Sequence, residues 1–277
     1  MKRTRTNFLL ICILLVGLSL LLYPTISNQW NSLHQSQAIV DYKTAMQDMV
    51  FTDYSAIFAE AEAYNAELAT IPYPLMNHSQ IESYAAVLNI SGTGIMGYLT
   101  IPKLDVELPI YHGTEEAVLQ KAVGHLEGTS LPIGGIGNHS VLSAHRGLPR
   151  AKLFTDLDKM EPGDCFTITV LDRQLTYQVD QILVVEPREV DALYPVAGMD
   201  YCTLITCTPY GINSHRLLVR GIRVENPIIP PIQSITADAV RMDYKAGALI
   251  LASPILLLLM IVTLLPSSAK KRRSSHG

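Results

Sequence analysis

The 277-residue sequence has few charged residues, and it lacks the short motifs of several common catalytic sites. Charged residues make up 17% and hydrophobic residues 48% of the chain. This balance is too apolar for a disordered or nucleic-acid-binding protein and too charged for a polytopic transporter. There is no CxxC, no HExxH and no close His pair, so no zinc-site spacing is present. The absence of G-x-S-x-G makes a serine-based triad a poor candidate.

Long apolar runs are confined to the two ends of the chain. Residues 8–23 contain no charge and span roughly 24 Å as a helix, whereas residues 246–265 span roughly 30 Å, the thickness of a hydrocarbon core. Cations flank each run on its terminal side, so the positive-inside rule predicts two passes, with both termini in the cytoplasm and the body outside. A cleaved signal peptide is the alternative for the first run. Residues 24–28 offer no A-x-A-like cleavage site, which favours a retained anchor in the lipid bilayer.

The body between these runs is acidic and about 220 residues long, enough for one domain with a substantial core. Seven of the 21 Lys and Arg residues lie in the terminal tails, and all 25 Asp and Glu residues lie between them, so the body carries a net charge of −11. This charge argues against nucleic acid and against docking on anionic lipid. It is compatible with a basic protein or an amine as partner.

Three cysteines of the body raise the question of a reactive thiol, because an odd number outside the membrane leaves one unpaired. Cys202 and Cys207 share one strand pattern about 16 Å apart, which is too far for a disulfide. Cys165 and Cys202 are expected to be small, buried apolar residues of the core, because each lies within or beside a strand pattern. Cys207 ends an apolar strand and precedes a turn at residues 208–211, a place where rigid scaffolds expose nucleophiles.

The pattern of the body changes from helical to strand-like near residue 97. Helical spacing covers residues 36–69, a proline-containing loop follows at 70–79, and one or two helical turns are expected at 80–88. Short helices are expected at 115–122 and 151–160. Seven strands predict a β-barrel or sandwich, at residues 97–104, 106–111, 140–143, 166–171, 175–185, 203–207 and 216–224.

A thiol nucleophile needs a partner that generates thiolate, because a free cysteine with a pKa near 8.5 is only slightly ionised at neutral pH. His145 follows an apolar strand just as Cys207 ends one, so the two can converge. Arg216 opens the last strand and can stabilise an oxyanion. Arg220 shares its face, with a surface salt bridge as the expected role. His34 and His78 are expected to face solvent, and His112 to make hydrogen bonds in a turn.

At these residues the sequence resembles a sortase, and among sortases it resembles class C, the pilin-polymerising cysteine transpeptidases. The motifs are TLITC at residues 203–207, continuing as TPYG, NSHRLLVRG at 213–221, AHRGLP at 144–149 and GHLEGTSLP at 124–132, within a similarity that covers about residues 84–224. The resemblance implies a closed, mostly antiparallel eight-stranded barrel. It also implies that Cys207 is the nucleophile, His145 the catalytic histidine and Arg216 the arginine that supports the oxyanion.

The same resemblance implies a function on the surface of a Gram-positive cell. An LPxTG-like signal on a pilin or surface protein is cleaved between Thr and Gly through a thioacyl intermediate, which a pilin Lys amine resolves, with no metal or organic cofactor. A sortase that anchors proteins to peptidoglycan is the nearer alternative, and a non-catalytic, doubly anchored binding or assembly protein the farther one. The Asp-Pro-aromatic motif of many class C lids is absent, and residues 72–74 read Pro-Tyr-Pro, so a lid over Cys207 is expected to be variant or absent.

These observations predict a defined order of segments. They are a cytoplasmic tail and first anchor at 1–27, a helical or lid region at 28–90, a catalytic barrel at 91–226, a linker at 227–245, a second transmembrane helix at 246–265 and a basic cytoplasmic tail at 266–277.

Overall fold

The computed structural model describes residues 2–49, 53–149 and 151–226, with side chains from residue 12 onward. The described residues fall into two compact units, one that ends at Ile26 and one that begins at Ser27. Helix α1 (Lys2–Gln47) contains Pro24 and shows no break at the expected boundary after residue 27. Its segment Cys12–Gln47 is long and apolar enough to cross a membrane. The expected linker, second transmembrane helix and basic tail (227–277) lie outside the described residues.

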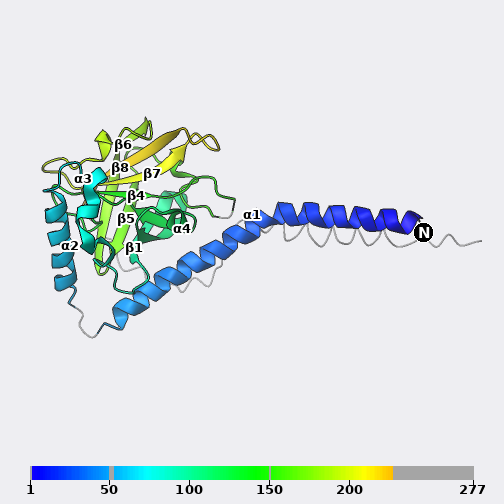
Figure 1. The fold of residues 1–277 in the computed structure, drawn as a ribbon, viewed down its shortest axis with the longest axis horizontal. Helices are drawn as coiled ribbons and strands as arrows, with labels where there is room; N and C mark the ends of the chain where they lie inside the picture. Colours follow the sequence, from blue (N-terminus) through cyan, green and yellow to red (C-terminus); the bar gives the residue numbers. More distant parts are fainter. Residues whose placement is uncertain (1, 50–52, 150, 227–277) are drawn as a thin grey trace, which may run out of the picture. The chain divides into compact units, whose positions relative to one another are not determined.

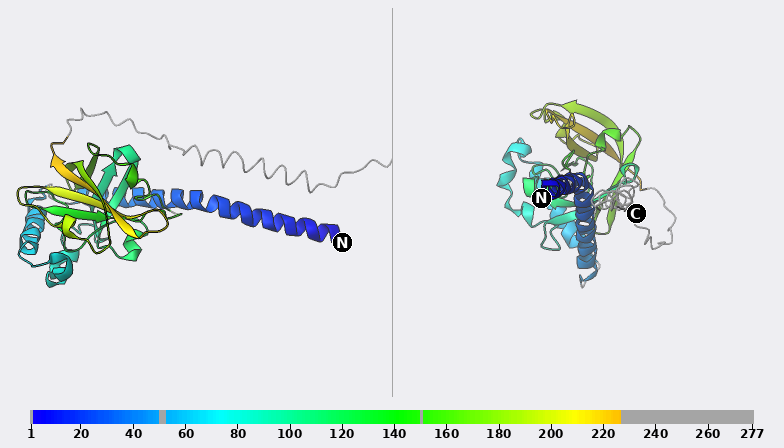
Figure 2. Two further views of the ribbon diagram at one scale, coloured as in Figure 1. Left: turned by 90° about the horizontal axis from the view of Figure 1, so that it is seen from above. Right: turned by 90° about the vertical axis from the view of Figure 1, so that its right-hand side faces the viewer.

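A closed eight-stranded barrel forms the centre of the second unit (Figures 1 and 2). The strands follow the order β1-β2-β3-β4-β7-β8-β6-β5 around it. Only the β2–β3 and β4–β7 pairs are parallel among them. The strands are β1 (Ile95–Ile101), β2 (Val106–His112), β3 (Val123–His125), β4 (His139–Ser143), β5 (Cys165–Val170), β6 (Arg173–Val185), β7 (Tyr201–Thr208) and β8 (His215–Val224).

The alternation of side chains along each strand divides the barrel into an inner and an outer face. On β7, Cys202 and Leu204 join the main core, whereas Ile205 belongs to a second, smaller cluster with Val141 and Leu218. This smaller cluster lies on the outer side of β4, β7 and β8. The barrel therefore offers an apolar floor outside its own core.

Short helices and turns surround the barrel. Helix α2 (Ser55–Leu68) contributes Phe58, Ala61, Tyr64 and Leu68, at helical spacing, to the main core. Helix α3 (Pro74–Asn77) continues into the 3-10 turns η1 (His78–Gln80) and η2 (Glu82–Ala85), and α4 (Glu116–Leu119) precedes β3. The remaining 3-10 turns are η3 (Pro102–Leu104), η4 (Leu157–Lys159) and η5 (Asp191–Leu193).

The predicted barrel is confirmed, with one strand more than the sequence pattern revealed. The additional strand, β3, has three residues, all buried, so it shows no alternation. The helix expected at 151–160 is wrong: within it only η4 is helical, because the segment is shaped by turns around buried Phe154. The helical segment at 36–69 is present as the end of α1 and the whole of α2.

Candidate active site

Cys207 and Arg216 are direct partners across β7 and β8. Residues opposite each other in an antiparallel pair point to the same face of the sheet. By alternation from Ile205 this is the outer face, and the Cys207 thiol is free and half-buried there. The Arg216 Nη1 donates to the carbonyl oxygens of Asn213 at 3.2 Å and His215 at 3.1 Å. These contacts hold one nitrogen of the guanidinium at the start of β8.

His145 reaches the same level from the other side of β7. Strand β4 runs parallel to β7 with Ser143 beside Ile205, and Ala144 N donates to Ile205 O at 3.2 Å, just beyond the end of β4. His145 is two residues after Ser143, and Cys207 is two residues after Ile205, so the two lie at the same level. Cys207 and Arg216 therefore lie side by side on β7 and β8, and His145 follows the end of β4 on the other side of Cys207, in the order histidine, cysteine, arginine.

A groove of about 660 Å³ lies over this outer face of the barrel. Its floor consists of Ser143, Val185, Ile205, Arg216 and Leu218, and thus of residues from β4, β6, β7 and β8. Its walls come from loops and short helices and include Leu75, His78, Thr114, Glu115, Leu119, Leu126, Glu127, Pro187, Glu189 and Leu193. An apolar floor that ends at a cation suits an extended, mostly apolar peptide whose reacting carbonyl lies near Arg216.

Helix α3 contributes directly to this groove. Leu75 packs against the cluster of the outer face, and His78 Nδ1 lies 3.0 Å from Glu127 Oε2. Gly128, at φ +83°, allows α3 to approach closely, because a Cβ there would lie 2.6 Å from Pro74 O. The expected loop at 70–79 is therefore partly helical, and it covers part of the groove without an Asp-Pro-aromatic motif.

Glu116 is a neighbour of the site that the sequence analysis missed. Its Oε2 lies 3.2 Å from His145 Nε2, and its Oε1 accepts a hydrogen bond of 2.5 Å from Gln120 Nε2. A carboxylate on one ring nitrogen of histidine fixes the orientation of the ring and leaves the other nitrogen for proton transfer. The available signal was the expected helix at 115–122, which brings an acidic turn close to the barrel strands.

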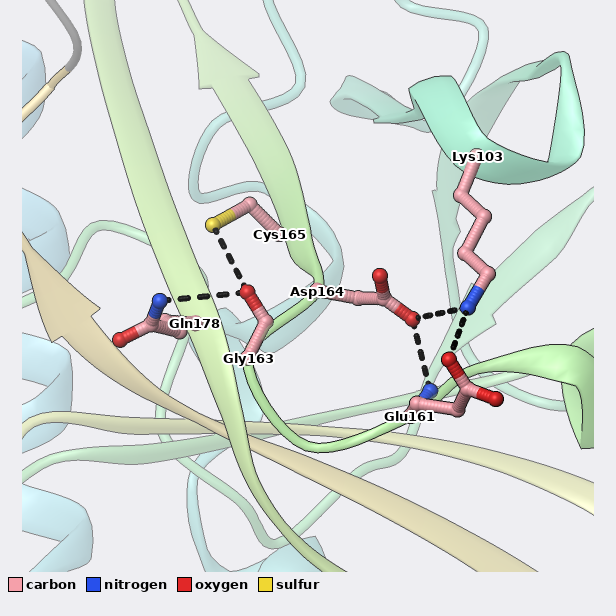
Figure 3. A network of polar contacts seen from close by, with 6 residues as sticks. All are labelled: Lys103, Glu161, Gly163, Asp164, Cys165 and Gln178. Carbon is pink, nitrogen blue, oxygen red and sulfur yellow. Dashed lines mark hydrogen bonds and ion pairs between the residues drawn. The ribbon is translucent and has the colours of Figure 1, made fainter.

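The other two cysteines of the body lie away from this site. Cys202 is fully buried as expected, and burial raises the pKa of its thiol well above the usual value. The expectation for Cys165 is wrong: it is exposed at the beginning of β5, next to a turn (Figure 3). Nearby, Lys103 Nζ donates to the carboxylates of Asp164 at 2.8 Å and Glu161 at 2.9 Å (Figure 3). These are ion pairs at the surface and do not form a catalytic site.

Several histidines have structural contacts. His112 lies within hydrogen-bond distance of two carbonyl oxygens, Gly94 O at 2.9 Å and Val87 O at 2.8 Å, as expected, but it is the last residue of β2 and not part of a turn. His125 is completely buried, with Nε2 at 2.9 Å from Ser130 O, and burial lowers its pKa to about 4. Burial also lowers the pKa of His139, whose Nε2 lies 2.7 Å from Thr203 Oγ1.

A free cysteine between a histidine and an arginine that lines an apolar groove is the side-chain set that cysteine-dependent acyl transfer requires. Comparison with known proteins gives the family. A family model described as the Sortase domain matches residues 99–224. The structure of sortase C1 from Streptococcus agalactiae is 49% identical with a TM-score of 0.63, and the match covers 69% of this chain and 99% of that one. Sortase C from Streptococcus pneumoniae is 45% identical with a TM-score of 0.62, covering 69% and 97%.

Curated relatives agree at lower coverage. Sortase SrtE1 from Streptomyces coelicolor is 36% identical in a match that covers 46% of this chain and 40% of that protein. Sortase D from Bacillus subtilis is 29% identical, and this chain covers 63% of its length. The chain belongs to the sortase family, whose members are cysteine transpeptidases, and its structural neighbours include class C members.

Proposed function

We propose that this protein is a pilin-polymerising sortase that cleaves an LPxTG-like signal and transfers the acyl group to a lysine amine. The observation that carries the proposal is the order of His145 after β4, Cys207 on β7 and Arg216 on β8, with Arg216 lining the groove. The family membership supports the reaction class. The 45–49% identity to sortases of class C supports the pilin substrate, because the Streptococcus pneumoniae structure is described as informative on pilin substrate specificity.

The first half-reaction forms a thioester. The Cys207 thiolate attacks the carbonyl carbon of the signal's threonine, and the oxygen acquires a negative charge. Arg216 lies opposite the thiol and stabilises this charge, a contribution of about 2.7–4 kcal/mol for a single oxyanion donor. As the tetrahedral intermediate collapses, the C–N bond to glycine breaks, and protonated His145 donates its proton to the leaving amine.

The second half-reaction transfers the acyl group to the acceptor. A neutral lysine amine attacks the thioester carbonyl, His145 takes the proton that the amine loses, and the C–S bond breaks to regenerate the thiolate. The groove wall carries Glu115, Glu127 and Glu189. Their charge favours the approach of a lysine-bearing partner.

A peptide assay tests the acyl-transfer step. The full chain in detergent is incubated with an LPxTG peptide, and the thioacyl adduct on residue 207 is detected by mass spectrometry. We expect an adduct in the wild type and in the matched control Cys165→Ala, and none in Cys207→Ala. An adduct on Cys165, or turnover by Cys207→Ala, would contradict the assignment of the nucleophile.

The same proposal includes the membrane layout and the second candidate acceptor. Helix α1 contains one segment of spanning length, and residues 246–265 supply the second pass by composition. A peptidoglycan amine in place of a pilin lysine would make this a surface-protein anchoring sortase with the same half-reaction at Cys207. Acceptor competition between the two amines distinguishes them.

A further inference from the structure

Beyond the last residue of β4, side chains continue to join that segment to the end of β7. Thr206 Oγ1 donates to Ala144 O at 2.8 Å, and Arg146 Nη1 donates to Thr208 Oγ1 at 3.3 Å. Ala144 and Arg146 flank His145, and Thr206 and Thr208 flank Cys207. The backbone on either side of the histidine is thus tied to the backbone on either side of the cysteine.

A third contact extends this connection, by one residue after Arg146 and two residues after Thr208. Gly147, at φ +76°, lies against the ring of Tyr210, and a Cβ on this glycine would be 2.6 Å from Tyr210 Cε2. A side chain at position 147 would therefore push the ring away. The two loops that follow His145 and Cys207 pack on each other directly.

Arg146 is the one charged member of this set, and it is almost fully buried. Its side chain is 9% exposed, and its Nη2 donates to Asp158 Oδ2 at 2.5 Å. Its Nε is buried without a hydrogen-bond partner. Burying a guanidinium is costly unless it is well paired. The arginine at this position is therefore not explained as a solvated surface charge, and its contacts point to another role.

Asp158 also belongs to the histidine side of the site. It lies in η4, just after a turn in which Phe154 N donates to His145 O at 3.1 Å, and Thr155 Oγ1 accepts from Gly147 N at 3.1 Å. The Arg146 guanidinium therefore links this turn to the threonine that follows Cys207.

We propose that Arg146 is a positioning residue that fixes the separation and orientation of His145 relative to Cys207. The inference rests on the proposed function, because it assigns the two tied residues to proton transfer and nucleophilic attack. A planar guanidinium serves two acceptors in fixed directions, whereas a lysine ammonium is a flexible point charge. A displacement of about 1 Å between reacting groups can cost about 10²-fold in rate.

The test compares two arginines that are each paired with an aspartate. Arg146→Met removes the link, and Arg220→Met is the matched control, because Arg220 is 20% exposed and donates to both Asp180 oxygens at 3.1 and 2.6 Å on β6. With the full chain in detergent and an LPxTG peptide, we expect Arg146→Met to lower kcat by about 10²-fold with KM changed less than about 3-fold. Arg220→Met keeps kcat within about 3-fold and loses only thermal stability. Arg146→Lys keeps the charge and remains at least about 10-fold slower than the wild type.

A second variant separates positioning from folding. Thr208→Val removes only the hydroxyl that Arg146 contacts and retains the Asp158 pair, and we expect kcat to fall by several-fold. The double variant, with Arg146→Met and Thr208→Val, is expected to be no slower than Arg146→Met alone, because both changes break the same link. If kcat is unchanged in both single variants while only the melting temperature falls, the inference is overturned.

The rate of Cys207 alkylation by iodoacetamide, followed by peptide mass spectrometry, tests the positioning role of Arg146 without substrate. If the wild type turns over no peptide, the proposed function fails. In that case, an alkylation rate that changes at least about 5-fold in Arg146→Met and not in Arg220→Met still supports the positioning role. Equal rates in the two variants overturn it.

Discussion

Cys207 on β7 and Arg216 on β8 face each other in register across an antiparallel pair, on the outer side of the barrel. The register fixes this relationship, because a slip by one residue would turn one of the two side chains into the core. Leu204, Leu217 and Val219 fill that core from the same two strands and hold the register. The packing of the barrel thus determines where the thiol and the guanidinium meet.

Removal of the Arg216 guanidinium tests its role in the transition state. Arg216→Ala is expected to lower kcat by about 10²–10³-fold, because the charge on the carbonyl oxygen loses its donor. Arg216→Lys recovers part of this loss, since it restores charge without the fork of donors. Steady-state kinetics with an LPxTG peptide measure both. A kcat within a factor of two of the wild type in Arg216→Ala would exclude the oxyanion role.

The three thiols of the body are expected to differ in accessibility. Cys165 is exposed, Cys207 is half-buried opposite Arg216, and Cys202 is fully buried with a raised thiol pKa. Iodoacetamide is therefore expected to label Cys165 and Cys207 in the folded protein and Cys202 only after denaturation. Mass spectrometry of peptides from native and urea-treated samples checks this. Native labelling of Cys202 would contradict the barrel interior described above.

Helix α3 is expected to restrict access to the groove through Leu75. Leu75→Ala removes an apolar contact with the outer-face cluster, so Cys207 alkylation should become several-fold faster. Met76→Ala is the matched control, because this neighbouring side chain is 82% exposed and makes no part of the groove lining. Equal alkylation rates in the two variants would show that α3 does not cover the thiol.

Burial of His125 makes stability depend on pH. Its pKa is about 4 in the folded protein and about 6.5 when unfolded, so between these values the unfolded chain binds a proton that the folded chain does not. The free energy of unfolding therefore falls as pH decreases from 6.5 to 4, by about 3 kcal/mol for this residue. His139, whose pKa burial also lowers, adds to the loss.

Urea denaturation followed by circular dichroism at pH 7 and pH 5 measures this effect. His125→Gln is expected to be less stable at pH 7 but to lose less between the two values. An unfolding free energy that rises toward pH 5 in the wild type would contradict the neutral, buried state of His125.

The sequence predicted the parts of the fold that carry long or repeated patterns. Alternation identified β5 and β6, short segments bounded by turn residues identified β1, β2, β4, β7 and β8, and the predicted strand that ends at Cys207 identified the thiol. The three-residue β3 was missed because it is too short to alternate, and the helix at 151–160 was wrong because turns around buried Phe154 replaced helical packing.

For the site, too, the sequence predicted only what local patterns reveal. His145 and Cys207 were paired because both follow apolar strands, a local signal. Glu116 and Arg146 were missed, because their contacts with His145 and Thr208 connect residues 29 and 62 positions apart and depend on the closed barrel. The exposure of Cys165 depends likewise on the turn before β5, and apolar neighbours in sequence do not reveal it.

We expect Cys207 to join pilin subunits through a lysine amine. The most direct measurement incubates the full chain in detergent with an LPxTG-bearing pilin subunit and follows covalent multimers on a denaturing gel, with Cys207→Ala and Cys165→Ala in parallel. A ladder is expected with the wild type and with Cys165→Ala, and none with Cys207→Ala. A ladder formed by Cys207→Ala, or thioacyl formation without any ladder while a peptidoglycan amine is acylated, would contradict it.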